Sequence, residues 1–173
     1  HDDLIKKFNN KCNNTYNSTC NNTNVYIMSE GREYCNWGGF SIVNATLNAM
    51  KYAINTLNIE FDYCINLSGT SFPIKSNELI RKSLTENPNA LYLQIMDPMD
   101  QPTPDSWHHY VECENKLHRI YRLTLPRGII HYMSSQWFTL PYHVIKWIIS
   151  NYFPIEFIEY AKHTIVADEN YFA

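Results

Sequence analysis

Two short stretches of the sequence combine residue types that could do chemistry. Ala167-Asp168-Glu169-Asn170-Tyr171 places two carboxylates at the expected start of a helix. Carboxylates can act as general bases, although the helix dipole is a sufficient structural reason for acidic residues there. Trp37-Gly38-Gly39 precedes another expected helix. Its glycines would let the backbone approach a ligand, and the helix N-terminus favours a phosphate or hydroxyl. A plain tight turn explains the same residues equally well.

Other familiar arrangements are missing from the sequence. The adjacent His108 and His109 would face opposite sides of a strand and could not chelate one metal together. Asp97 and Asp100 do not have the D-x-D spacing of a metal site. The sequence holds no C-x-x-C pair, no G-x-S-x-G nucleophile elbow and no G-x-G-x-x-G or Walker-type loop. We therefore predict no metal site and no bound cofactor.

Composition indicates one globular domain over residues 1–173. The chain is 45% hydrophobic and 14% aromatic, enough for a core and too much for disorder. A net charge of -3 and a pI near 6.2, without a basic cluster, argue against a nucleic-acid binder. No apolar run reaches the length of about 18 residues that a membrane span needs. His1-Asp2-Asp3 lacks the features of a signal peptide, so we expect a mature or truncated start.

Cysteines and glycosylation triplets indicate the compartment. Five cysteines leave at least one thiol unpaired. Cys12 and Cys20 could close a short loop, whereas Cys64 is expected to be a buried free thiol in a strand. The N-x-[ST] triplets favour the secretory pathway, although the chain is rich in Asn and chance is a serious alternative. These triplets begin at Asn13, Asn17, Asn21, Asn44 and Asn66.

Strands alternate with helices along the chain, which predicts an α/β fold with a mostly parallel sheet. Ser41 should cap a helix, and its apolar residues at spacings of three and four predict one buried face. That face consists of Val43, Leu47, Met50, Ile54 and Leu57. Ser76 should cap a second helix with Leu79, Ile80 and Leu84 facing inward.

The remaining elements are shorter. Strands are predicted at residues 25–28, 63–67, 91–95 and 137–140, and helices at 143–152 and from Asp168 to Phe172. Polar loops are predicted at residues 9–24, 35–39 and 97–106, with turns at 87–89 and 114–116.

The order of these motifs resembles the core-2/I-branching glycosyltransferase family, which comprises β-1,6-N-acetylglucosaminyltransferases and peptide O-xylosyltransferase relatives. Five matches in order carry the resemblance over residues 25–173, and His1-Asp2-Asp3 is similar to the family's His-x-Asp. The matching segments are Val25–Glu30, Trp37–Ser41, Ile65–Lys75, Ser134–Phe138 and Ala167–Phe172. Trp107–Leu117 further resembles the family's acceptor-side segment.

The resemblance implies a GT-A-type fold, a UDP-sugar donor, inversion at the anomeric carbon and no metal. Glu169 matches the catalytic glutamate, and one carboxylate base suits a single displacement. The resemblance further implies that nucleotide-sugar binding falls to Asp3, Asn36, Trp37, Gly38, Ser135 and Gln136, and the acceptor side to Trp107 and Tyr110. It also implies a Golgi-lumenal type II membrane protein, anchored by a segment not present in this chain, with a glycan or glycoprotein acceptor.

Three positions depart from the family pattern. Ser71 replaces an Asp, Ser106 replaces the Arg that precedes Trp107 in the N-acetylglucosaminyl branch, and Gln136 replaces an Asp of xylosyltransferases. The resemblance also implies basic residues that bind the leaving diphosphate, and the chain ends before them. The family's first strand is missing before His1 as well, which suggests a partial catalytic domain truncated at both ends. The expected activity is transfer of N-acetylglucosamine to a glycan. Protein O-xylosyl transfer, favoured by Trp37-Gly38-Gly39-x-Ser41, and an inactive glycan- or UDP-binding relative remain alternatives.

Overall fold

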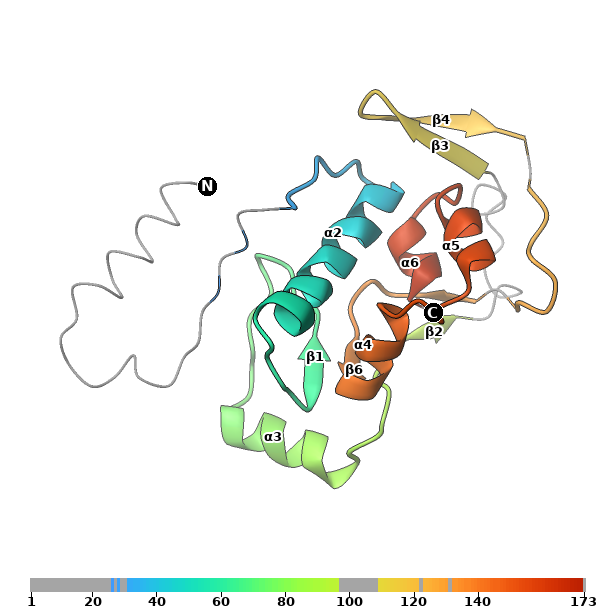
Figure 1. Cartoon of the computed structure of the whole chain (residues 1–173). Helices are drawn as coiled ribbons and strands as arrows, with labels where there is room; N and C mark the ends of the chain where they lie inside the picture. Colours follow the sequence, from blue (N-terminus) through green and yellow to red (C-terminus); the bar gives the residue numbers. More distant parts are fainter. Residues whose placement is uncertain are drawn as a thin grey trace, which may run out of the picture. The chain divides into compact units, whose positions relative to one another are not determined.

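The computed structural model describes Tyr26, Met28 and residues 31–96, 109–121, 123–130 and 132–172, without the side chain of Asn170. The chain divides into two units, His1–Arg32 and Glu33–Ala173, and every element below belongs to the second (Figure 1). The predicted loops 9–24 and 97–106 lie outside the described residues, as do Asp3 and Trp107. Of the strand predicted at 25–28, only Tyr26 and Met28 are described, and neither is in a strand. In the described ranges, no helix is long and apolar enough to cross a membrane.

Helix α2 (Phe40–Lys51) continues as a short π-helix, η1 (Tyr52–Thr56). Its predicted inward face is confirmed, because Val43, Leu47 and Met50 are buried. The predicted Ser41 cap is wrong: Gly39 is the N-cap residue. The Ser41 hydroxyl instead donates a hydrogen bond to Glu112, a contact that periodicity along one helix cannot reveal.

The described strands form three two-stranded sheets, and all three pairs are antiparallel. The predicted mostly parallel sheet is therefore wrong for the described part of the chain. The pairs are β1 (Tyr63–Ile65) with β6 (Thr139–Pro141), β2 (Ile95–Met96) with β5 (Met133–Ser134), and β3 (His109–Cys113) with β4 (Lys116–Ile120). The predicted alternation of strands with helices holds only as far as β2, because among the described elements β2 to β6 follow one another and three helices come after them. Strand direction depends on how the chain returns between paired strands.

The β3–β4 hairpin shows how turn chemistry sets strand direction. Its predicted turn is confirmed at Glu114 and Asn115, whose φ angles are 49° and 58°. Two successive residues of positive φ suit a two-residue hairpin loop, because their twist matches that of antiparallel strands. His109 consequently pairs with Ile120 and Cys113 with Lys116.

Three predicted strands differ from the observed ones in their bounds. The strand predicted at 137–140 is β6, which begins two residues later, at Thr139. β1 is shorter than residues 63–67, and it is less buried than predicted, because Ile65 and Leu67 are exposed. In the segment predicted as a strand at 91–95, Tyr92 forms one isolated antiparallel bridge with Thr139 and β2 begins only at Ile95. Short strands take their ends from the partner strand, which local sequence does not specify.

The helices outside α2 agree with prediction to different degrees. The Ser76 cap of α3 (Asn77–Glu86) is confirmed, since its hydroxyl accepts from the Leu79 N–H at 3.4 Å. The predicted inward face of α3 is not, because Leu79 is exposed. Helix α4 (Tyr142–Ile148) ends earlier than predicted, and α5 (Ile155–Ala161) was not predicted. Helix α6 (Ala167–Tyr171) begins one residue before the predicted start.

The hydrophobic core joins α2 to the C-terminal helices and to β6 (Figure 1). Aromatic rings fill the space around α6: Phe40 of α2 meets Tyr171 edge-on, and Phe172 packs on Phe138. The buried residues are Phe40, Val43, Leu47, Met50, Phe138, Leu140, Ile145, Ile148, Ala161, Ala167, Tyr171 and Phe172. The core therefore links α2, which follows the Trp37-Gly38-Gly39 motif, to α6, which contains the acidic motif.

The described cysteines Cys35, Cys64 and Cys113 are free thiols, and Cys12 and Cys20 lie outside the described residues. Cys64 is only half-buried rather than buried, and burial raises the pKa of its thiol. Of the glycosylation triplets in the described part, Asn44 lies within α2, and the Asn66 amide donates to the Gln136 carbonyl at 2.8 Å.

Candidate functional site

The loop that precedes α2 is a tight turn with one exposed aromatic side chain. The Gly39 N–H donates to the Asn36 carbonyl at 3.0 Å, and the Asn36 N–H donates to the Ser41 hydroxyl at 3.1 Å. Gly38 lies at φ 76°, a conformation that favours glycine. Trp37 is 79% exposed although its neighbours Gly38 and Gly39 are buried. A tryptophan so exposed does little for the core, and it is free to stack against a ligand.

Glu112, on β3, holds this loop from a distant part of the sequence. Its carboxylate accepts hydrogen bonds from Asn36 Nδ2 at 2.6 Å, from the Ser41 N–H at 2.9 Å and from the Ser41 hydroxyl at 2.6 Å. The Ser41 N–H is one of the first helical N–H groups, which have no partner inside the helix. A remote carboxylate therefore caps α2 in place of a residue of its own loop.

The hydrogen bonds to Glu112 favour its charged form. Partial burial by itself would raise the pKa of Glu112, but the donors of Ser41 and Asn36 outweigh burial and lower the pKa below its ordinary value. Sequence reasoning missed this residue. Its only signal was a carboxylate within the segment 107–117 that resembles the family's acceptor side.

The loop is joined directly to the start of α6. The Ala167 N–H donates to the Gly38 carbonyl at 3.3 Å, and a Cβ placed on Gly38 would lie 3.3 Å from the Val166 nitrogen. Helices α2 and α6 pack against each other along the same contact. The structure thus brings the predicted residues Asn36, Trp37 and Gly38 next to the helix that carries Glu169.

Both carboxylates of α6 are in surroundings that oppose ionisation. Asp168 is only 5% exposed, and its Oδ1 has no hydrogen-bond partner among the described residues. Burial raises the pKa of Asp168, and burial together with the Asp168 charge raises the pKa of Glu169. The N-cap residue of α6 is Val166, without a side-chain cap. Asp168 is therefore a buried carboxylate, and the hydrogen bonds from the backbone N–H groups of Asp168 and Glu169 offset only part of the effect of burial on its pKa.

The hairpin lies against the segment just before α6. The Tyr110 N–H donates to the His163 carbonyl at 2.8 Å, and His109 forms an isolated bridge with Thr164. The predicted acceptor-side residue Tyr110 is therefore close in space to the segment leading into α6. Trp107, the other one, lies outside the described residues.

Ser135 and Gln136 follow β5, which packs against α6. The Ser135 N–H donates to the Gln94 carbonyl at 3.3 Å, and the Ser135 hydroxyl accepts from the Trp137 N–H at 3.3 Å. The Gln136 carbonyl accepts from Asn66. These bonds tie the backbone of the two residues to the sheets. Ser135 and Gln136 directly follow the strand that packs beside α6. Asp3 lies outside the described residues.

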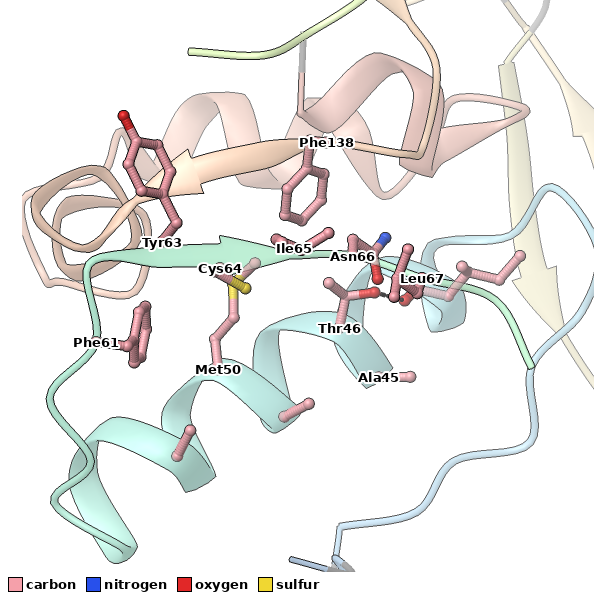
Figure 2. Close-up of a pocket in the computed structure, with 13 residues that line it drawn as sticks. Ala45, Thr46, Met50, Phe61, Tyr63, Cys64, Ile65, Asn66, Leu67 and Phe138 are labelled. Carbon is pink, nitrogen blue, oxygen red and sulfur yellow. Dashed lines mark hydrogen bonds between the residues drawn. The ribbon is translucent and has the colours of Figure 1, made fainter. Parts of the chain in front are cut away.

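One cavity lies elsewhere, between α2 and β1 (Figure 2). It measures about 640 Å³, and its lining is largely apolar, with Met50 of α2 pointing toward Cys64 of β1 and with Phe138 on the far side. A second cavity of about 840 Å³ lies between α3 and the β1–β6 pair. Neither cavity is lined by Asn36, Trp37, Gly38 or Glu169. Polar groups that could bind and deprotonate a substrate are concentrated at the loop and α6, so we place the candidate site there.

No metal centre is found in the part of the chain that the structure describes. There, no group of three or more His, Cys, Asp or Glu side chains is close enough to hold a metal ion. The described site offers carboxylates, amides, a hydroxyl and an exposed indole, a set that suits hydrogen bonding to a polar ligand and proton transfer.

Comparison with known proteins finds matches over most of the chain. The family model of the Core-2/I-Branching enzyme matches residues 5–173. Xylosyltransferase 2 of Rattus norvegicus is 25% identical over 143 residues, which cover 79% of this chain and 16% of that protein. The beta-1,3-galactosyl-O-glycosyl-glycoprotein beta-1,6-N-acetylglucosaminyltransferase of Bos taurus is 29% identical over 160 residues, which cover 85% of this chain and 34% of that protein.

The chain therefore spans between about a sixth and a third of the length of these relatives. The family match, in contrast, takes in both candidate motifs, from the loop at Trp37 to the helix at Glu169, together with the hairpin between them. The chain belongs to the Core-2/I-Branching enzyme family.

Proposed function

We propose that this chain contributes the donor loop and the catalytic base of an inverting glycosyltransferase. The donor is a UDP-sugar, with N-acetylglucosamine as the sugar and a glycan or glycoprotein as the acceptor. The observation that carries the proposal is the hydrogen bond from the Ala167 N–H to the Gly38 carbonyl, because it joins the loop of Trp37 to the helix of Glu169.

Glu169 would act as the general base. The acceptor hydroxyl oxygen attacks the anomeric carbon of the donor and forms the new glycosidic bond. The bond from that carbon to the UDP oxygen breaks, UDP departs with the electron pair, and the hydroxyl proton passes to the Glu169 carboxylate. One displacement inverts the anomeric centre and needs one base.

The surroundings of Glu169 suit this role. A base is most effective when its pKa approaches the working pH. Burial, with the charge of Asp168, raises the pKa of Glu169 in that direction. The half-buried position of Glu169 also leaves its carboxylate access to an acceptor.

The donor would bind at the loop before α2. Asn36 and the backbone of Gly38 can meet polar atoms of the nucleotide, and the exposed Trp37 ring can stack on a flat or apolar ligand face. Asp3, Ser135 and Gln136 complete the proposed donor contacts, and Trp107 and Tyr110 face the acceptor. These assignments come from the resemblance of the motifs, and the described geometry supports those at the loop most directly.

The resemblance extends the proposal to the whole enzyme. It would have a GT-A-type catalytic domain, work without a metal ion, and reside in the Golgi lumen on a type II membrane anchor. Protein O-xylosyl transfer is the second candidate, favoured by the form Trp37-Gly38-Gly39-x-Ser41 and by the similarity to xylosyltransferase 2.

Calorimetry with UDP tests the proposal first, with GDP as the control nucleotide. We expect UDP to bind and GDP to bind much more weakly. Transfer assays with UDP-N-acetylglucosamine and UDP-xylose then identify the sugar by which donor is consumed. Failure to bind UDP would contradict the proposal, and binding without transfer from either donor would indicate an inactive relative.

A further inference from the structure

A single carboxylate ties together two regions that are far apart in sequence. The Glu112 side chain receives three short hydrogen bonds, one from Asn36 and two from Ser41, across separations of 76 and 71 residues. Asn36 and Ser41 flank Trp37, Gly38 and Gly39 on either side. The carboxylate of the hairpin therefore holds both ends of the loop at once.

The loop is also shaped around this carboxylate. A Cβ placed on Gly39 would lie 2.7–2.8 Å from the carboxyl atoms of Glu112. The φ of Gly39 is -86°, which any residue can adopt. A Cβ at position 39 would therefore displace the Glu112 carboxylate, whereas at position 38 glycine is favoured by its positive φ.

We propose that Glu112 is the positioning residue for the donor loop, and that through it the β3–β4 hairpin controls donor binding. The inference rests on the proposed function, and it adds a link between the two substrates. The hairpin belongs to the segment that resembles the acceptor side, yet its carboxylate fixes the loop proposed to bind the donor. A loop that also visits other conformations binds its ligand more weakly, because only the fraction in the binding conformation can bind. A loop that is held in the binding conformation avoids this loss of affinity.

The first test compares Glu112→Gln with Glu114→Gln in the same hairpin. Glutamine keeps the size of the side chain and one acceptor oxygen, but an NH₂ group that cannot accept replaces the other oxygen, so the three donors of Asn36 and Ser41 are no longer all satisfied. Glu114 is an exposed turn residue, so its variant controls for the change of charge. Hydrogen exchange at the amides of residues 36–42 reports on the loop, and exchange in α4 confirms that the core is intact.

We expect faster exchange in residues 36–42 for Glu112→Gln alone. If the loop then occupies its binding conformation about a tenth of the time, the apparent Kd for UDP rises about tenfold. The maximal transfer rate at saturating donor should fall much less, which separates a positioning role from general loss of structure. Unchanged exchange and unchanged UDP affinity would overturn the inference.

Gly39→Ala tests the same contact from the other side, without altering the hairpin. It should displace the Glu112 carboxylate and reproduce the effects of Glu112→Gln on loop exchange and UDP affinity. In the double variant the two effects should not add, because both break one contact. Additive effects would contradict the inference. If the unaltered protein bound no UDP, the proposed function would fail, while the exchange measurements would still decide whether Glu112 positions the loop.

Discussion

The starts of α2 and α6 meet at one hydrogen bond, but they treat their polar groups in opposite ways. At α2, a carboxylate from another strand receives three donors, and the pKa of Glu112 is lowered. At α6, the carboxylates belong to the helix itself. Asp168 Oδ1 has no hydrogen-bond partner among the described residues, and the pKa values of Asp168 and Glu169 are raised.

This difference separates a group that holds structure from a group that can accept a proton. A fully hydrogen-bonded carboxylate is stabilised as an anion and is a weak base, as at Glu112. A carboxylate whose charged form is disfavoured by burial and by a neighbouring negative charge is a stronger base, as at Glu169. Under the proposed function, the start of α2 therefore serves to position the loop and the start of α6 serves proton transfer.

Removing the base should give the largest effect. Glu169→Gln keeps size and polarity but cannot accept the acceptor proton, so the rate should fall about 10²–10⁴-fold, or roughly 3–5 kcal/mol. Steady-state transfer assays measure this, and calorimetry should find UDP affinity nearly unchanged, because the base contacts the acceptor. Glu156→Gln, an exposed change on α5, is the control. Near-normal transfer by Glu169→Gln would show that the base has been assigned wrongly.

Removing the exposed ring at the α2 side should act on binding instead. Trp37→Ala is expected to weaken UDP affinity about tenfold, roughly 1.4 kcal/mol, because a stacking surface is lost. The unfolding midpoint should change little, since the ring is 79% exposed. Calorimetry measures the UDP affinity and thermal unfolding measures the midpoint on the same samples. Trp147→Ala on α4 is the control, because it removes a tryptophan outside the loop. Loss of folding in Trp37→Ala would make this side chain a core residue.

The junction between the two helix starts can be strained directly. Gly38→Ala forces a Cβ into a backbone at φ 76° and to within 3.3 Å of the Val166 nitrogen. We expect destabilisation of about 1 kcal/mol, measured by denaturant unfolding. Gly128→Ala is the matched control, because Gly128 also has positive φ, at 85°, but its Cβ would meet nothing within 4 Å. Equal losses in the two variants would mean that only the backbone conformation, and not the contact with α6, matters.

The smallest expected effect is a gain of stability at α6. Since burial raises the pKa of folded Asp168 above its ordinary value of 3.8, its contribution to stability is present below pH 3.8 and is lost as pH rises through the folded pKa. Asp168→Asn should therefore stabilise the protein at pH 7, by less than about 1 kcal/mol, and the gain should shrink in acid. Thermal unfolding of both proteins between about pH 3.5 and 7 checks how this gain depends on pH. A loss of stability at pH 7 would mean that the ionised carboxylate is satisfied.

Local sequence determined much of what surrounds the site. The spacing of Val43, Leu47 and Met50 predicted the buried face of α2, and Ser76 was identified as the cap of α3. The hairpin turn at Glu114 and Asn115 and the start of α6 near Asp168 were also predicted. Each of these depends on side chains within a few residues of one another, so a short window of sequence holds the necessary information.

The tertiary structure alone decided the direction of the strands, the burial of Asp168 and the partner of Ser41. The pairing of β1 with β6 and the bonds of Glu112 to Asn36 and Ser41 join residues more than 70 positions apart. Such contacts depend on the path of the whole chain, and no local propensity encodes them. Sequence motifs thus identified the loop of Trp37 and the helix of Glu169, but only packing of α2 against α6 placed them side by side and set the opposite pKa shifts of their carboxylates.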